Sequence, residues 1–523
     1  MTSPTPLWAQ SGTVAPVPPM AAPLSQLPTL GDFSDISTSA ERRLGDRIAR
    51  EIYRDPDYID DPVLADYVQS IWLPLLASAR ARGELTPELD ERFAWQIMLG
   101  RDRTVNAFAL PGGYFGVHLG LIGIVASRDE LASVLGHELS HVTQRHISRL
   151  ISKQGQQTPW LIGAMILGAL AASKNADAGN ALIVGGQAVT AQNQLNFSRD
   201  MEREADRVGY GVMTGAGFEP QGFVSMFDKL QQASRLNDNG AYPYLRSHPL
   251  TTERIADMQA RQALLTPNPG KTALTFEHAM IAARARVLSN PGVDALRALL
   301  AESSGPQLAA LSAPRQAAAL YGAALAASRL RDFANARVDL ARVTGLVRTD
   351  ATAARLVRLL DAEIALTAGD MAHAAAVLKT NAALPSVNAG ESAGSGRPEL
   401  LLWAQIATQA GSAAAGTGAG TLSEVSQRLQ LWVTAHPRDS QAWQLLSTTY
   451  AAQGQTLRAI RADAETHVAM LDYPAALDRL KAAQQLLRQD RLNKVVVDHI
   501  DASIIDTRHR QVEALLKEQA LDR

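Results

Sequence analysis

Cysteine is absent from this chain of 523 residues. Its absence excludes disulfide bonds, thiol nucleophiles and cysteine-ligated metal sites, and it fits both the cytosol and the periplasm. The chain also lacks an excess of charge of one sign, because its formal net charge is only -2. Such a balance does not favour binding to nucleic acid or to an anionic membrane surface.

Long apolar runs are lacking too. The longest, residues 160–172, is shorter than the roughly 20 residues that cross a bilayer, so we expect no transmembrane helix. A buried or interfacial helix is the better interpretation. The first residues lack the basic start and apolar core of a complete secretory signal. Residues 7–10 fit either the tail of a trimmed signal or an irregular N-terminus.

The length predicts more than one domain. Residues 1–38 are rich in proline and are expected to form a disordered or linker segment. Residues 39–268 are expected to form the next domain, beginning with a helix at about residues 40–54 and becoming almost entirely helical after residue 117. A small sheet is expected between these helices, from strands at residues 93–98, 105–110 and 114–117, with a turn at residues 111–113.

Residues 269–523 are rich in alanine and leucine and show short amphipathic helices in pairs. Phe333, Met371 and Tyr473 are each expected to open the second helix of a hairpin. Five residues fit the spacing of a tetratricopeptide repeat: Trp443, Leu446, Tyr450, Gly454 and Ala459. An irregular helical bundle is the alternative. The predicted fold is therefore mainly α, a zincin-like domain with a small sheet followed by an all-α helical-repeat domain whose concave surface binds proteins.

The main chemical signal is His137-Glu138-Leu139-Ser140-His141. Ser127 and Glu130 have the form of a capping box, so a helix is expected from about Arg128 to beyond His146. His137 and His141 then lie one turn apart on one face and can share a Zn²⁺ ion, while Glu138 can reach a water molecule as general base. The alternative is a surface helix with two solvated histidines.

A third metal ligand is expected on a second helix, near residues 200–206. Glu202 and Asp206 are four residues apart and share a face, whereas Glu204 points about 200° away from Glu202. With Glu202 as the ligand, Asp206 is free to accept a hydrogen bond from a ligand imidazole or to order its helix. A solvated acidic face is the alternative.

Four motifs together resemble a known family. They are residues 106–113 (NAFALPGG), 137–141 (HELSH), 202–209 (EREADRVG) and 247–249 (SHP). They resemble the gluzincin metallopeptidases of the CAAX-prenyl-protease and HtpX type, and most closely the periplasmic BepA branch, which joins such a domain to tetratricopeptide repeats. The resemblance covers nearly the whole chain after residue 38. It implies one Zn²⁺ per chain, held by His137, His141 and Glu202.

The resemblance also implies that His248 lies near the metal. There it can stabilise the oxyanion of the tetrahedral intermediate, or it can fill the open coordination position and keep the enzyme latent. Arg246 is a lesser candidate for the oxyanion role. The segment 154–194 is expected to be either a lid over the cleft or a core helix with flexible flanks.

These residues predict hydrolysis of peptide bonds, with Glu138 as base and the strand at residues 104–109 holding an extended substrate. Asn106 is expected to order the end of that strand. The resemblance implies quality control of outer-membrane protein assembly in the periplasm, with the repeats contacting clients or the assembly machinery. One alternative is a repeat-domain chaperone with a latent protease, and another is a purely structural zinc site.

Overall fold

The structure is a computed structural model that describes residues 36–153, 199–235, 241–263, 274–379, 396–410, 421–493 and 499–521. The predicted lid at 154–194 and the apolar run at 160–172 lie outside these residues, as does nearly all of the predicted N-terminal segment. Among the described helices, none combines the length and the hydropathy needed to cross a bilayer.

A four-stranded sheet lies in the N-terminal half, in the order β1-β2-β4-β3. Its strands are β1 (Tyr58–Ile59), β2 (Gln96–Gly100), β3 (Ala107–Leu110) and β4 (Tyr114–His118). β2 and β4 are parallel, with Ile97 opposite Phe115, and the other pairs are antiparallel. The three predicted strands are confirmed with shifted ends. β1 is too short to leave a periodic pattern in the sequence.

The predicted turn at residues 111–113 is a single 3₁₀ turn, η1 (Pro111–Gly113), between β3 and β4. Gly113 has a φ of 80°, and a Cβ atom there would lie 2.8 Å from the Cβ of Phe93. Only glycine fits both the left-handed backbone and the close approach.

Helices surround this sheet. They are α1 (Thr38–Arg54), α2 (Pro62–Ala81), α3 (Pro87–Arg92), α4 (Leu119–Ile124), α5 (Arg128–Thr143), α6 (His146–Lys153), α10 (Arg199–Gly215), α11 (Gln221–Arg235), α12 (Tyr244–Ser247) and α13 (Thr252–Ala263). The core between sheet and helices is aromatic, because the rings of Trp72 in α2 and Phe115 in β4 meet edge-on with centroids 4.6 Å apart.

The helix that carries the two histidines is shorter than the sequence predicts. α5 ends at Thr143, Arg145 has a φ of 52°, and a new helix begins at His146. The prediction of one helix running past His146 is therefore wrong. The start is as predicted, because the Ser127 side chain accepts from the backbone N–H of Glu130. The Glu130 carboxylate, however, accepts from Ala126 and not from Ser127, so half of the capping box forms.

The described residues of the C-terminal half form helices and no strand. Its helices are α14 (Phe276–Ser289), α15 (Val293–Ser304), η2 (Pro306–Ala310), α16 (Ala313–Arg329), α17 (Phe333–Leu346), α18 (Ala351–Ala368), α19 (Met371–Lys379), α20 (Arg397–Ala410), α22 (Leu422–Ala435), α23 (Ser440–Ala452), α24 (Thr456–Ala469), α25 (Tyr473–Leu492) and α26 (His499–Leu521). Phe333, Met371 and Tyr473 each open a helix, as predicted. The predicted fold class is confirmed, while the tetratricopeptide assignment stays a prediction.

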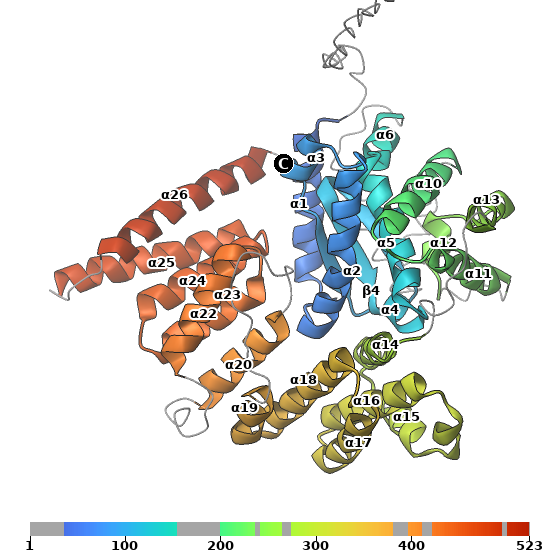
Figure 1. The fold of residues 1–523 in the computed structure, drawn as a ribbon. Coiled ribbons are helices and arrows are strands. Elements are labelled where there is room, and N and C mark those ends of the chain that lie inside the picture. The colour runs from blue at the N-terminus through green and yellow to red at the C-terminus, as the bar shows by residue number, and fades with distance from the viewer. Residues whose placement is uncertain are drawn as a thin grey trace, which may run out of the picture.

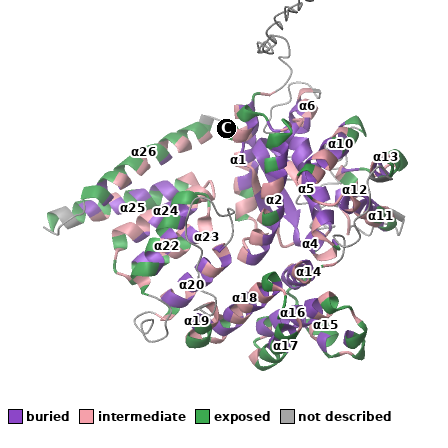
Figure 2. Cartoon of the chain, viewed as in Figure 1, coloured by how far each residue is buried: buried purple, intermediate pink, exposed green. Residues whose placement is uncertain are grey.

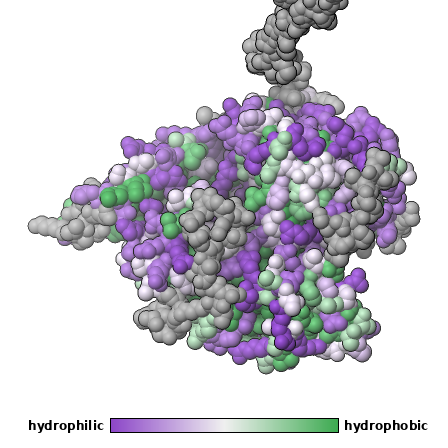
Figure 3. Space-filling model, in the orientation of Figure 1, coloured by the Kyte–Doolittle hydropathy of each residue, from purple (hydrophilic) through white to green (hydrophobic). Residues whose placement is uncertain are grey.

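The C-terminal helices curve around the N-terminal half, with α14–α18 below it and α22–α26 beside α1 (Figure 1). One hydrophobic cluster runs from α2 through α5 to α16 and α18, so the core continues between the two parts. The predicted boundary at residue 268 falls among residues 264–273, which are not described, and stays a prediction. Hydrophilic side chains dominate the face over α22–α26 (Figure 3). A few large apolar side chains of these helices, such as Leu431 and Ile500, are exposed.

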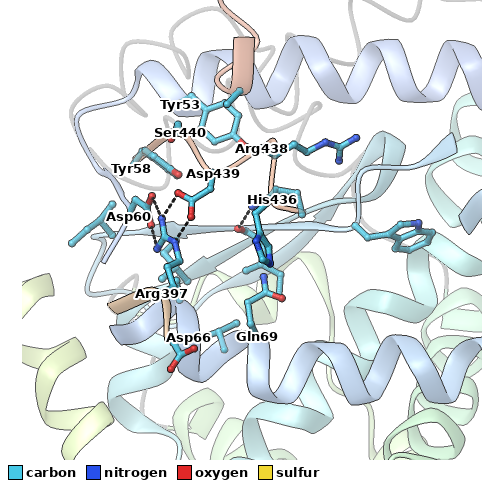
Figure 4. Close-up of a pocket in the computed structure, with 18 of the residues that line it drawn as sticks. Tyr53, Tyr58, Asp60, Asp66, Gln69, Arg397, His436, Arg438, Asp439 and Ser440 are labelled. Carbon is cyan, nitrogen blue, oxygen red and sulfur yellow. Dashed lines mark hydrogen bonds and ion pairs between the residues drawn. The ribbon is translucent and has the colours of Figure 1, made fainter. Parts of the chain in front are cut away.

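Three arginines of the C-terminal helices connect the two halves. Each lies between one carboxylate from the start of α2 or the residues just before it and one from the C-terminal helices. The groups are Arg284 with Asp61 and Glu363, Arg355 with Asp66 and Glu399, and Arg397 with Asp60 and Asp439. Figure 4 shows the third group, in which Arg397 points at both carboxylates. These ion pairs fix how the C-terminal helices sit against α2.

Candidate metal centre

The centre forms where α5 and α10 cross. Gly136 and Gly209 face each other at this crossing, and a Cβ atom on Gly209 would lie 2.9 Å from the carbonyl carbon of Gly136. Because neither residue has a side chain, the two backbones approach closely. This contact brings the His137 end of one helix against Glu202 and Asp206 on the other.

Four side chains converge at the crossing: His137, His141, Glu202 and His248. The Nε2 atoms of His137 and His141 are 3.0 Å apart, and each lies 3.5 Å from an oxygen of Glu202. His248 comes from the residues after α12, and its Nδ1 lies 3.3 Å from His137 Nε2 and 3.1 Å from Glu202 Oε1. The structure thus places the two predicted histidines, the predicted third ligand and His248 in one cluster.

Glu138 adjoins this cluster with both carboxylate oxygens lacking a hydrogen-bond partner among the described residues. Its Oε1 lies 3.5 Å from His248 Nε2. Residues 129–143 of α5 are all buried (Figure 2). Glu138 itself is only 1% exposed. A buried carboxylate without a hydrogen bond is costly, and the neighbouring imidazole of His248 offsets part of that cost.

Asp206 supports the cluster from behind. Its Oδ1 lies 2.9 Å from His137 Nδ1, and its two oxygens accept from Nε and Nη2 of Arg254 at 2.6 and 2.7 Å. The Nη1 of Arg254 lies 2.8 Å from Glu202. One guanidinium therefore holds both carboxylates of α10, and Asp206 holds the ring of His137.

The carboxylates of the centre attract positive charge. Burial would lower the pKa of His137, but hydrogen bonds to Asp206 and Glu202 outweigh it and raise the pKa to about 9. Burial and the neighbouring His137 hold the pKa of His141 well below its usual range. Burial raises the pKa of Glu138. The carboxylates of Asp206 and Glu202 thus favour a positive charge at this position.

The donor set fits a zinc-type ion. Ligands about 2.0–2.2 Å from a tetrahedral centre lie about 3.3–3.6 Å from one another. The distances of 3.0–3.5 Å among His137, His141 and Glu202 are close to this spacing. Two imidazoles and one carboxylate are also the donor types of catalytic zinc sites, which keep one position open. In this conformation, His248 Nδ1 lies toward that fourth position.

Other predicted residues are not among the four that converge. Arg246 is exposed at the end of α12, and Glu204 points away from Glu202, as the helical periodicity predicts. Asn106 is buried just before β3, where its carbonyl accepts from the backbone N–H of His118. It lies at the strand end, as expected.

Two residues of the centre were missed by the sequence analysis. The ring of Tyr244 stacks on His248 with centroids 4.6 Å apart, and nothing in its sequence context predicts this contact. Arg254 did leave a signal. It lies in the first turn of α13, where the helix dipole disfavours a cation, so a strong acidic partner could have been expected.

The sequence of this chain is similar to those of known peptidases. Residues 65–262 match the model of peptidase family M48. These residues are similar to that peptidase family. The predicted resemblance is confirmed, because curated relatives bear the name beta-barrel assembly-enhancing protease. One from Escherichia coli (strain K12) is 31% identical over 337 residues, which cover 63% of this chain and 64% of the relative.

Two further relatives extend this picture. A protein of Vibrio cholerae serotype O1, named putative beta-barrel assembly-enhancing protease, is 34% identical over 317 residues, 59% of this chain and 61% of its own length. A Yersinia pestis protein named beta-barrel assembly-enhancing protease is 27% identical over 449 residues, 84% of this chain and 85% of its own. The chain covers 61% of the Vibrio cholerae relative and 64% of the Escherichia coli relative, which is less than two thirds of each.

Proposed function

We propose that this chain is a zinc-dependent endopeptidase, with His137, His141 and Glu202 as the ligands. The observation that carries the proposal is the buried cluster of these three residues beside Glu138, whose carboxylate oxygens accept no hydrogen bond from the described residues. When bound, Zn²⁺ polarises a scissile carbonyl and lowers the pKa of its water. Glu138 takes the proton of the attacking water and passes it to the leaving amine, while Asp206 orients His137.

The substitution Glu138→Gln tests this assignment. It keeps the shape of the side chain and the metal ligands but removes the base, so cleavage of an unfolded model protein should fall at least about 100-fold. Elemental analysis should still find one zinc per chain. Glu91→Gln, the same change at an exposed residue of α3, is the control and should cleave normally. Cleavage by Glu138→Gln at the wild-type rate would refute the mechanism.

We propose further that the described conformation is a latent one. His248 lies within 3.3 Å of His137 and 3.1 Å of Glu202, toward the fourth ligand position, and within 3.5 Å of Glu138. An attacking water needs that space. His248→Ala should then raise the basal rate of peptide cleavage while zinc stays bound. If His248 instead stabilises the oxyanion, the same variant should lose about 100-fold or more in kcat.

The second candidate function is binding of unfolded clients by the C-terminal helices, with the protease latent. A cavity of about 440 Å³ between the two halves supports it, because aromatic side chains of both halves line it together with Arg438. Figure 4 shows Tyr53, Tyr58 and Arg438 around this space. Such a lining suits a short stretch of extended polypeptide with an apolar side chain.

Filling the cavity tests client binding. Gln69→Trp adds bulk to its wall and should weaken binding of a labelled unfolded polypeptide to the Glu138→Gln protein, measured by fluorescence anisotropy. Thr448→Trp adds the same group at an exposed position of α23 and should bind normally. Equal affinities of all three proteins would exclude the cavity as the client site.

We also propose, from the names of the relatives, a role in quality control of outer-membrane β-barrel assembly in the periplasm, with the assembly machinery as partner. The lack of cysteine is compatible with that compartment, as it is with the cytosol. Crosslinking the Glu138→Gln protein in Gram-negative cells should capture assembly components in the periplasmic fraction. Capture that is confined to cytosolic proteins would refute this role.

A further inference from the structure

The two ligand histidines are supported differently on their far sides. A metal-binding imidazole uses one nitrogen for the ion and needs a partner for the other, which fixes its tautomer and its ring plane. For His137 that partner is the carboxylate of Asp206. For His141 it is another imidazole, because His141 Nδ1 lies 2.9 Å from Nδ1 of His146.

The break between α5 and α6 makes this contact possible. In a continuous helix, a residue five positions after His141 would lie about 140° around the axis from it. The left-handed backbone of Arg145 interrupts the helix, so His146 begins a new one. The centroids of the His146 and His141 rings are 4.9 Å apart. Arg145 is held there by Glu41, which is buried in α1.

His146 is itself anchored. Its Nε2 lies 3.1 Å from Oε2 of Glu204, and the same oxygen accepts from Nη1 of Arg149 at 2.9 Å. Glu204 is the α10 residue whose side chain points away from Glu202, so it is free for this second task. His146 is fully buried and Glu204 is partly exposed. The chain Glu204–His146–His141 thus runs from near the surface to the cluster.

Proton positions along this chain follow from one requirement. If His141 binds a cation through Nε2, its proton lies on Nδ1 and is donated to His146 Nδ1. The proton of His146 then lies on Nε2 and is donated to Glu204. Every nitrogen has a single consistent role, and only a neutral His146 fits between the two partners.

We propose that His146, held by Glu204, is a positioning residue that fixes the tautomer and ring orientation of the metal ligand His141. The role rests on the metal centre proposed above and adds a relay that differs from the direct carboxylate behind His137. The competing explanation is that His146 only stabilises the start of α6. The two explanations differ in whether metal affinity or folding stability changes.

The test measures Zn²⁺ affinity of the full chain by competition with a chromophoric chelator. His146→Phe keeps a buried ring but has no acceptor for the His141 proton, so affinity should fall about 10- to 100-fold. His146→Gln offers an amide oxygen and should recover most of the loss. The absorption spectrum of bound Co²⁺ should change in His146→Phe as the ligand geometry relaxes.

His278→Phe is the matched control. His278 is also buried, and its ring contacts Tyr67 and the carbonyl of Val125, far from the cluster in the sequence and in its contacts. This variant should lose thermal stability but keep wild-type Zn²⁺ affinity. If His146→Phe behaves in the same way, with altered stability and unchanged affinity, the positioning role is wrong.

If His146→Phe does not fold, Glu204→Ala is the alternative test of the relay. Glu204 is partly exposed, so its replacement should disturb folding less. It should weaken Zn²⁺ binding by up to about 10-fold, and unchanged affinity would contradict the relay. A wild-type chain that takes up no Zn²⁺ would overturn the metal centre itself and the relay with it. Tight wild-type binding with equally tight variants overturns only the relay.

Discussion

At the metal centre, both carboxylate oxygens of Glu138 lack a hydrogen bond from the described residues, whereas at the junction of the two halves each carboxylate is paired with an arginine. Both regions bury charge. At the junction, Arg397 forms two hydrogen bonds with Asp60 and two with Asp439. Such saturation indicates a structural contact.

The difference separates two uses of buried charge. A saturated pair fixes the arrangement of two elements, and nothing remains for a ligand. An unsaturated group keeps an electrostatic demand that a ligand or a reacting proton must meet. Both uses occur near Arg254. Its guanidinium donates two hydrogen bonds to Asp206 and none to Glu138.

The largest expected loss of stability follows removal of Arg254. Arg254→Met leaves Asp206 and Glu202, each about 1% exposed, without their guanidinium. Leaving a buried charge unpaired costs about 3–5 kcal/mol. Urea unfolding of the metal-free protein should show a loss of this size.

Arg203→Met is the control for that measurement. Arg203 is on α10 too, but it is exposed and pairs with Glu253 at the surface. Exposed ion pairs contribute little to stability because solvent screens them. If both variants lose the same free energy of unfolding, burial of the Arg254 ion pairs does not increase their contribution to stability.

Metal binding should give the next largest effect. Free Zn²⁺ at about 100 times its dissociation constant should raise the free energy of unfolding by about 2.7 kcal/mol. Glu202→Ala removes a ligand and should abolish the rise, whereas Arg397→Met at the junction should keep it. A rise that persists in Glu202→Ala would place the bound metal elsewhere.

The sequence predicted the fold where patterns are local. Ser127 marks the start of α5, and residues 111–113 mark a turn, because caps and glycine turns act over a few residues. The end of α5 was missed, since the left-handed Arg145 is stabilised by Glu41, about a hundred residues earlier in the chain. Helical periodicity carries no record of that contact.

For the site, helical geometry selected Glu202 over Glu204, and the structure places Glu202 in the cluster. His248 came only from the family resemblance, because a histidine before proline has no periodic signal. Arg254 and His146 escaped because their partners lie on other elements. Contacts of this kind depend on how α5, α10 and α13 pack, which the sequence pattern does not specify.

A smaller loss of stability is expected at the junction. Arg397→Met leaves Asp439 buried and Asp60 partly exposed, so solvent relieves part of the cost. Hydrogen bonds to charged groups contribute about 1.5–3 kcal/mol, and urea unfolding should show a loss in this range. Small-angle X-ray scattering should show a larger radius of gyration, because this contact holds α20 against the segment before α2. Arg479→Met, at an exposed pair in α25, should change neither quantity.

The smallest expected effect is a difference in pH dependence between the two carboxylates that share Arg397. Burial would raise the pKa of Asp439, but hydrogen bonds from Arg397, Trp432 and the backbone of Ala442 lower it. Burial also raises the pKa of Asp60, and there the charge and hydrogen bonds of Arg397 do not outweigh it.

The two shifts have opposite consequences for stability. Because the folded pKa of Asp439 is lowered, its contribution is present above the unfolded pKa of about 3.9 and is lost as the pH falls through the folded pKa. Asp60 has a raised folded pKa, so its contribution is present below about 3.9 and is lost as the pH rises. The free energy of unfolding, measured with urea between about pH 3 and pH 6, should therefore rise less steeply with pH in Asp439→Asn than in wild type. In Asp60→Asn it should rise more steeply than in wild type. If the free energy of unfolding has the same slope against pH in both variants, the pKa values of Asp60 and Asp439 are shifted alike. The additional hydrogen-bond donors to Asp439 would then have no effect on its pKa.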